Sequence, residues 1–372
     1  MNPTVTPARE ITTIAQLLAQ PDLPGFAGRQ HLARVGFDAA TQPGGTRVST
    51  LVAAGVDRKS SRKYAASLRQ YATFVRVDNL PSACSKFPIP ISGLWPYLAA
   101  LSGAVEYNTV LQHLSGLKYW HDALGTPWPA RDDPGTRSIL AAIRRAPRHR
   151  PVEQANPISL DHLKRMHNRI DGTRQGHALL WMLSTFAFHG LLRPGEFALG
   201  DTEPETLARA VRLSDITQDT TASGIPFVMV SLRYAKHNNP TTATDIRLLA
   251  TGDVTCPVAA WENYRRVVNP PGPYAFTTTA GEIVSRRWFI TSVTNFLEGI
   301  LQNPSGYSFR SGGAIHLVHL GFTADMIKAR GRWTDDTWHR YVRHNNRFWT
   351  ELEVRYRFLV PDERRPPPPT GV

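Results

Sequence analysis

Cysteine is scarce in this 372-residue sequence, which contains only Cys84 and Cys256. Two cysteines cannot form the disulfide framework that holds small secreted domains together, and their scarcity fits a reducing compartment. A secretory signal is also lacking, because the first ten residues have no apolar core. We therefore expect an intracellular protein, located in the nucleus if its host is eukaryotic.

Long apolar runs are absent too. The most apolar predicted helix, residues 178–192, is shorter than a membrane span and is interrupted by Ser184, Thr185 and His189. His316 and His319 have a spacing seen in metal sites, but no acidic residue or cysteine accompanies them. These absences predict a soluble protein with no membrane partner, no metal and no cofactor.

Acidic residues are outnumbered by basic ones. The chain has 43 Lys and Arg residues against 30 Asp and Glu residues, which gives a formal charge of +13 and an isoelectric point near 10.1. A surplus of this size attracts anionic polymers, so such a polymer is the first partner to consider.

The first part of the chain predicts an arm and a helical domain. Residues 1–54 mix Pro, Gly, Thr and Arg without sustained periodicity, which indicates a flexible arm. Residues 60–74, 91–102, 107–124 and 134–145 have helical patterns, and together they predict a four-helix domain over 55–150. The candidate phosphate-binding residues of this domain lie off its apolar stripes or at its exit: Arg62, Lys63, Arg69, Arg144, Arg145, Arg148 and Arg150.

The second part predicts a mixed but mostly helical domain over residues 151–358. It begins with a helix capped by Ser159, continues through the apolar helix to Arg193, and then alternates as an antiparallel sheet between 213 and 249. Helices are expected at 258–267 and 285–301, followed by three short ones after residue 308. Residues 359–372 read as a proline-rich tail.

The segment from Tyr307 to Tyr341 combines residues suited to phosphodiester chemistry. It contains the run 307–314 (Tyr-Ser-Phe-Arg-Ser-Gly-Gly-Ala) and then Gly331-Arg332-Trp333, and it ends with Tyr341 on a helix. Arg310 falls in the first turn of a helix, where free N–H groups also favour a phosphate. A tyrosine nucleophile served by arginines needs no metal to stabilise charge on the phosphate.

This segment resembles the C-terminal signature of the tyrosine recombinases, the phage-integrase family, and is closest to the Gly-Arg-Trp form of Crypton and DIRS mobile elements. The resemblance implies an arginine in a Gly-Leu-Arg-x-x-Glu context, which we identify in residues 190–196 (Gly-Leu-Leu-Arg-Pro-Gly-Glu) with Arg193 and Glu196. It also implies a lysine on a hairpin, and Lys236 follows the alternating run 227–232. The expected fold is a SAM-like core-binding domain followed by a mixed α/β catalytic domain.

The resemblance also implies a role for each residue. Arg193 and Arg310 would clamp the phosphate, Lys236 would be the general acid and Tyr341 the nucleophile, with Glu196 orienting an arginine. Tyr307 occupies the usual histidine position, where a phenol is a poorer base and can hydrogen-bond a phosphate oxygen. The family's His-or-Trp position lies nine residues before the nucleophile, at Arg332, whereas Trp333 lies eight before it. We prefer Trp333, and Arg332 stays open.

The function implied is site-specific recombination or integration of double-stranded DNA through a 3′-phosphotyrosyl intermediate, for integration and excision of a mobile element. Two alternatives remain: a domesticated DNA-binding protein without catalysis, and a type IB topoisomerase-like enzyme. The resemblance further implies a homotetramer in a synaptic complex on DNA, and a monomer or dimer without DNA. The apolar segment 344–360 would dock on a neighbouring protomer, or on its own domain.

Overall fold

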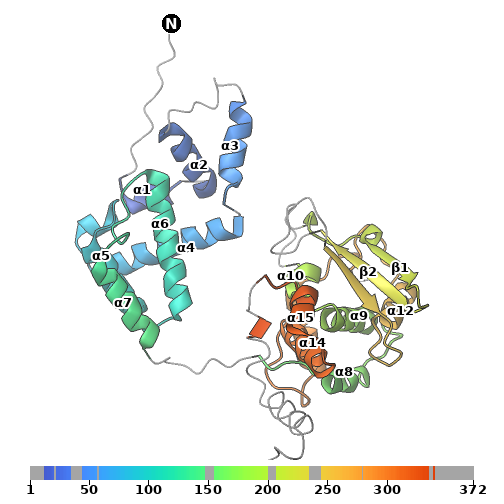
Figure 1. The fold of residues 1–372 in the computed structure, drawn as a ribbon. Coiled ribbons are helices and arrows are strands. Elements are labelled where there is room, and N and C mark those ends of the chain that lie inside the picture. The colour runs from blue at the N-terminus through green and yellow to red at the C-terminus, as the bar shows by residue number, and fades with distance from the viewer. Residues whose placement is uncertain are drawn as a thin grey trace, which may run out of the picture. The chain divides into compact units, whose positions relative to one another are not determined.

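The structure is a computed structural model in two compact units, residues 1–152 and 153–372 (Figure 1). It describes residues 12–20, 22–34, 44–56, 58–146, 155–199, 207–233, 244–278, 280–334 and 338–339. Four predicted site residues therefore lie outside the described residues: Lys236, Tyr341, Arg148 and Arg150.

The first unit is helical throughout its described part. Its elements are α1 (Ile14–Leu18), α2 (Leu23–Arg34), α3 (Gly45–Ala54), α4 (Arg58–Val77), the 3-10 turn η1 (Ser82–Ser85), α5 (Ile91–Leu101), α6 (Tyr107–Leu124) and α7 (Pro134–Arg145). The apolar stripe of α4 buries Leu68 and Tyr71 against α6, from which Leu117 and Trp120 enter the same core. Four of these helices, α4 to α7, lie where the sequence predicts them.

The structure differs from the expected flexible arm at residues 1–54. Helices α1, α2 and α3 form there, and the first two bury Ile14, Leu17 and Phe26 in the core of the unit. Thr13 caps α1 through a reciprocal pair of hydrogen bonds with Gln16. Burial against α4 and α6 stabilises short helices whose own sequence signal is weak.

The basic side chains predicted to meet phosphates are exposed where they are described. Arg62, Lys63 and Arg69 are exposed on α4, and Arg144 and Arg145 are exposed in the last turn of α7. The opposite stripe of α4 is buried, as an amphipathic helix requires. These guanidinium and ammonium groups are therefore accessible to a ligand.

The second unit is built around the helix α9 (Gln175–His189), which is mostly apolar and is surrounded by other elements. Every residue from Ala178 to Phe188 is buried. On one side α9 contacts α12 (Pro257–Val267), which in turn contacts the sheet, and on another it contacts α14 (Ser308–His319). The other helices in the described part of this unit are α8 (Leu160–His167), the short α10 (Pro194–Phe197), α13 (Arg286–Phe296) and α15 (Ala324–Gly331). A helix surrounded in this way holds its C-terminal end in a fixed place.

The sheet has three antiparallel strands in the order β1-β2-β3. The 3-10 turn η2 (Leu213–Asp215) leads into β1 (Ile216–Thr220), followed by β2 (Pro226–Leu232) and β3 (Thr244–Leu249). Val230 is paired with Ile216 on one side and Ile246 on the other. Lys236 falls between β2 and β3, outside the described residues. The predicted mainly helical unit with a small antiparallel sheet is confirmed in the described part of the chain. No helix in that part is both long and apolar enough to cross a membrane.

Two glycines bring α14 against its neighbours. A Cβ on Gly312 would lie 1.7 Å from the carbonyl oxygen of Ile158, and one on Gly313 would lie 2.2 Å from that of Phe188. Only glycine permits backbone approaches this close. Gly313 thus seats α14 on the end of α9, as the adjacent helices in Figure 1 show, and Gly312 brings it against the backbone that precedes α8. This packing carries Arg310 to the end of α9.

Candidate active site

Arg193 and Glu196 form the first half of the site, in the short helix that follows α9. Glu196 accepts from the backbone N–H of Arg193 at 2.7 Å and pairs with its Nη1 at 3.0 Å. Pro194 occupies the first helical position, where its fixed φ suits a helix start. The carboxylate is buried, with 4% of its side chain exposed, so its cationic partners compensate for lost hydration.

Leu191 supplies a backbone acceptor at the centre of the site. Its φ of 48° lies in the left-handed region, although it carries a branched side chain that is fully buried. It stands two residues before Arg193, where the Gly-Leu-Arg motif has glycine. Its carbonyl accepts from Arg310 and, at 3.1 Å, from Arg332. Such a conformation costs roughly 1 kcal/mol, and here it aims one oxygen at two guanidiniums.

Arg310 projects from the first turn of α14 and is fully buried. It donates to the carbonyls of Leu191 and Gly331. The indole of Trp333 covers its guanidinium, with 4.2 Å between Cζ and the ring centroid, which is a cation–π contact. The predicted arginine is thus held by two backbone segments 140 residues apart and by an aromatic face.

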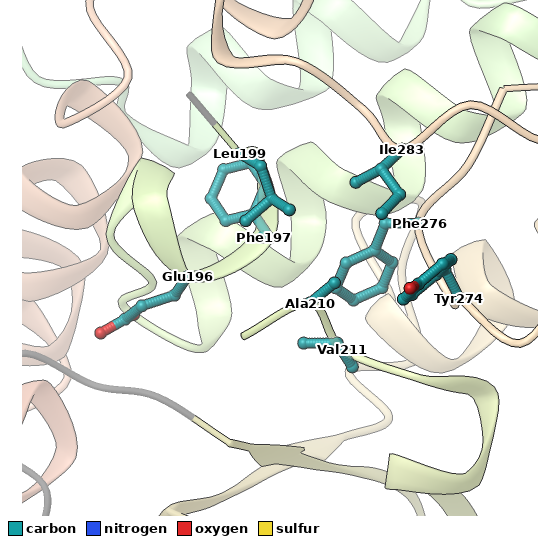
Figure 2. A pocket seen from close by; sticks show the side chains of 8 residues that line it. All are labelled: Glu196, Phe197, Leu199, Ala210, Val211, Tyr274, Phe276 and Ile283. Atoms are coloured by element: carbon teal, nitrogen blue, oxygen red, sulfur yellow. The ribbon is translucent and has the colours of Figure 1, made fainter. Parts of the chain in front are cut away.

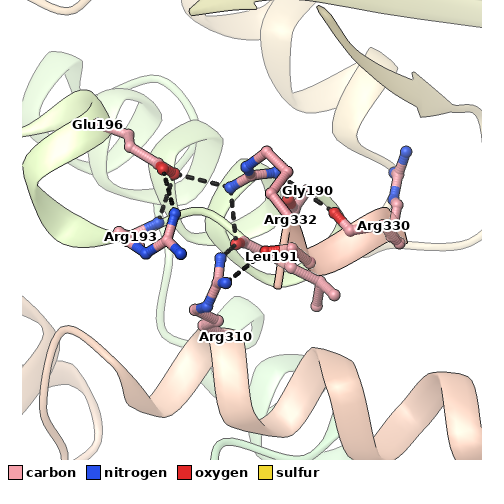
Figure 3. Close-up of polar contacts among 8 residues, drawn as sticks. Gly190, Leu191, Arg193, Glu196, Arg310, Arg330 and Arg332 are labelled. Carbon is pink, nitrogen blue, oxygen red and sulfur yellow. Dashed lines mark hydrogen bonds and ion pairs between the residues drawn. The ribbon is translucent and has the colours of Figure 1, made fainter. Parts of the chain in front are cut away.

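Arg332 ends α15 in the left-handed conformation, with φ of 55°. Its Nη2 pairs with Glu196 at 2.8 Å, and its Nη1 donates to the carbonyl of Gly190 at 3.2 Å. Burial lowers the pKa of the Arg332 guanidinium, and the charge of Glu196 opposes that shift. A single carboxylate therefore links Arg193 to Arg332, as Figure 3 shows.

Arg330 is a further buried arginine that the sequence analysis did not single out. It donates to the carbonyl of His189 at 2.8 Å, and burial, with a contribution from Arg332, lowers its pKa to about 10. It is still charged at neutral pH. Three arginines from α14 and α15 thus cap three consecutive carbonyls, 189 to 191, where a helix dipole favours cations.

Two aromatic residues near these arginines, Tyr307 and Trp338, differ in their exposure. Tyr307 precedes α14 with 49% of its surface exposed, and its hydroxyl makes no hydrogen bond among the described residues. Trp338 is buried in a small apolar cluster with Leu191, Ile327 and Trp333. Of the predicted residues, the structure brings together Arg193, Glu196, Arg310, Arg332 and Trp333. Tyr307 lies at the exposed N-terminal end of α14, the helix that carries Arg310. Lys236 and Tyr341 stay predictions.

A pocket borders Glu196 on its other side, lined by Phe197, Leu199, Ala210, Val211, Tyr274, Phe276 and Ile283 (Figure 2). None of these residues is basic, and the Glu196 carboxyl points away from the aromatic rings (Figure 2). The basic side chains beside Glu196 are therefore the arginines described above and not part of this pocket. Within the described ranges, no three His, Cys, Asp or Glu side chains form a group that could hold a metal ion. His316 and His319 accordingly belong to no such group.

Comparison with known proteins finds similarity at the level of structure. No family model matches the sequence, and no curated protein matches it. The chain is similar to XerH site-specific recombinase in a post-cleavage complex with a palindromic difH substrate, with a TM-score of 0.53, 12% identity, and coverage of 94% of this chain and 98% of that one.

Two other solved structures are similar to a comparable extent. A lambda integrase dimer bound to a COC′ core site has a TM-score of 0.52 at 14% identity, over 81% of this chain and 76% of that one. The Tn1549 transposon integrase with transposon right end DNA has a TM-score of 0.50 at 11% identity, over 92% and 99%. At identities this low, the structural similarity establishes the fold alone. The closer resemblance to Crypton and DIRS elements stays a prediction. The chain has the fold of the tyrosine recombinases.

Proposed function

We propose that this chain is a site-specific DNA recombinase or integrase that cuts and rejoins DNA through a 3′-phosphotyrosyl intermediate. One observation carries the proposal: Arg193, Glu196, Arg332, the Leu191 carbonyl and Arg310 form one connected, buried network. A fold alone supports many functions, whereas arginines held in this way at the expected motif positions suit phosphoryl transfer. Integration and excision of a mobile element is the biological role we infer.

The chemistry follows from these side chains. The Tyr341 oxygen attacks phosphorus, the P–O5′ bond breaks, and Lys236 gives a proton to the departing 5′ oxygen. Arg193 and Arg310 stabilise charge on the non-bridging oxygens. The phenol, with an ordinary pKa of about 10, gives its proton to solvent water as the bond to phosphorus forms. Reversal by a 5′ hydroxyl restores the phosphodiester, so religation consumes no nucleotide.

The described chain supports Tyr341 as the nucleophile. Trp338 packs on Leu191 and Trp333, which themselves contact Arg310. Three residues of extended chain span about 10 Å, so Tyr341 can reach the arginines from Trp338. Tyr307 precedes Arg310 by three residues and is the alternative phenol.

Double-stranded DNA is the proposed substrate. The similar XerH, lambda and Tn1549 proteins are bound to DNA in their structures. In this chain the formal charge of +13 and the exposed Arg62, Lys63 and Arg69 support phosphate contacts along a duplex. We place the protein inside the cell, and in the nucleus of a eukaryotic host, because its substrate is there.

The test is a covalent adduct on a nicked suicide duplex that carries the terminus of its own element. Wild-type protein should form the adduct, and Tyr341→Phe should abolish it while DNA binding persists. Tyr307→Phe is the matched control and should still form adduct. An adduct that survives Tyr341→Phe and disappears in Tyr307→Phe would reassign the nucleophile.

The same assay separates the alternatives. Wild-type protein that shifts its duplex but never cleaves it would identify a domesticated DNA-binding protein. Relaxation of a supercoiled plasmid without strand exchange between two duplexes would identify a topoisomerase. Recombined product from two marked duplexes is the result we expect.

We also propose that four protomers assemble on two duplexes, because exchange of four strands needs four phosphotyrosyl links. Segment 344–360, which lies outside the described residues, carries Phe348, Trp349, Leu352, Val354, Tyr356, Phe358 and Leu359. We expect it to dock on a neighbouring protomer. Truncation after Asn346 should leave half-site binding as a monomer and prevent tetramers, as measured by light scattering. Tetramers of the truncated protein on DNA would refute this docking.

A further inference from the structure

The sequence leaves two candidates, Arg332 and Trp333, for the position before the nucleophile, and the structure gives them different surroundings. Trp333 lies flat over Arg310. Arg332 turns away from that face, because its left-handed backbone directs the side chain to Glu196 and to the turn 190–191 (Figure 3). The two adjacent residues therefore cannot act in the same way.

Four of the five hydrogen-bond donors of Arg332 are committed to the protein. A guanidinium has five N–H groups. Nη1 donates to the carbonyls of Gly190 and Arg330 at 3.2 and 3.4 Å, and Nη2 donates to the Leu191 carbonyl at 3.1 Å and to Glu196 at 2.8 Å. The fifth donor, at Nε, is buried. The charge of Arg332 is paired with a buried carboxylate, whereas the acceptors of Arg310, the Leu191 and Gly331 carbonyls, are neutral and can be replaced by a phosphate.

Glu196 is the group through which Arg332 can act. Its Oε1 is occupied by Nη1 of Arg193, and its Oε2 is shared by the backbone N–H of Arg193 and Nη2 of Arg332. The guanidinium groups of Arg193 and Arg332 thus share one buried carboxylate. Without Arg332, Glu196 would pair with Arg193 alone, and the position of the Arg193 guanidinium would shift towards the carboxylate.

We propose that Arg332 is a positioning residue, which orients Arg193 through Glu196 and does not itself bind the scissile phosphate. The inference rests on the proposed function, since it concerns the same reaction. It gives the arginine nine residues before Tyr341 a role within the protein, and it leaves the indole of Trp333 as the group beside Arg310.

The test is a double-mutant cycle in single-turnover cleavage of the suicide duplex. Arg332→Gln should slow cleavage by about 10-fold to 100-fold in the wild-type background, the range expected when a reacting group is misplaced by about 1 Å. In the Glu196→Gln background the same change should cost less than about threefold, because the group it acts through is gone. Equal losses in both backgrounds would mean direct phosphate binding and would overturn the proposal.

Two further variants separate positioning from a structural role. Arg332→Lys keeps a charge opposite Glu196 and should recover at least part of the loss. A lysine variant no faster than the glutamine variant would overturn the proposal. Arg330→Gln is the matched control: it removes a buried arginine that bonds the His189 carbonyl, so its effect should be the same in the wild-type and Glu196→Gln backgrounds. Wild-type protein that forms no adduct would refute the proposed function, a result distinct from an additive cycle.

Discussion

The seating of α14 on the end of α9 makes a sharp prediction for Gly313→Ala. The new Cβ would lie 2.2 Å from the Phe188 carbonyl oxygen, whereas real Cβ contacts stay above 3.0 Å, so α14 must move outward by about 1 Å. Overpacking of this kind costs about 1–3 kcal/mol of folding free energy. The same movement carries Arg310 away from the Leu191 carbonyl, and a 1 Å misplacement slows a reaction by about 100-fold.

The matched control for this prediction is Gly176→Ala in the first turn of α9. A Cβ there meets nothing within 4 Å, so alanine should be neutral or stabilise the helix by up to about 1 kcal/mol. Both variants would be compared by denaturant unfolding and by single-turnover cleavage of the suicide duplex. If Gly313→Ala unfolds and cleaves like Gly176→Ala, the close approach of α14 does not position Arg310.

Two further predictions concern charge. Burial lowers the pKa of His189 to about 4. The unfolded chain binds that proton near pH 6.5, so the stability contributed by neutral His189 is present above pH 6.5 and lost as pH falls towards 4, by about 1.4 kcal/mol per unit. His189→Gln should flatten this dependence in unfolding titrations, and an unchanged slope would contradict it. Arg69→Ala on α4 should reduce the slope of log affinity against log salt by about 1, uniformly across DNA sequences, and a sequence-dependent loss would indicate base contact instead.

Local sequence patterns predicted much of the fold and part of the site. The mostly apolar run at 178–188 and the alternation at 227–232 are local patterns, so helix α9 and strand β2 could be predicted from them directly. Short motifs predicted Arg193 and Arg310 as site residues, and the structure adds why Gly312 and Gly313 accompany Arg310. Lys236 and Tyr341 stay predictions from the same motifs.

The features that could not be predicted from the sequence depend mainly on contacts between residues far apart in the chain. Pro24, Gly25 and Gly28 weaken the intrinsic helix signal of α2, and burial of Phe26 and Leu32 in the unit's core overrides it. The pairing of Arg332 with Glu196 joins residues 136 positions apart, and no local pattern encodes it. The left-handed backbone at Leu191 was hidden because leucine gives no sign of that conformation.

The arginines at the end of α9 are held by oxygens that belong to the backbone. The carbonyls of His189, Gly190 and Leu191 accept from Arg330, Arg332 and Arg310, and no side-chain substitution can delete a carbonyl. Drift in the identity of residues 189 and 191 therefore leaves the acceptors in place as long as the chain path is kept. A leucine can then stand where a motif search expects glycine, so the arrangement of the three arginines can be kept after the local sequence motif has changed.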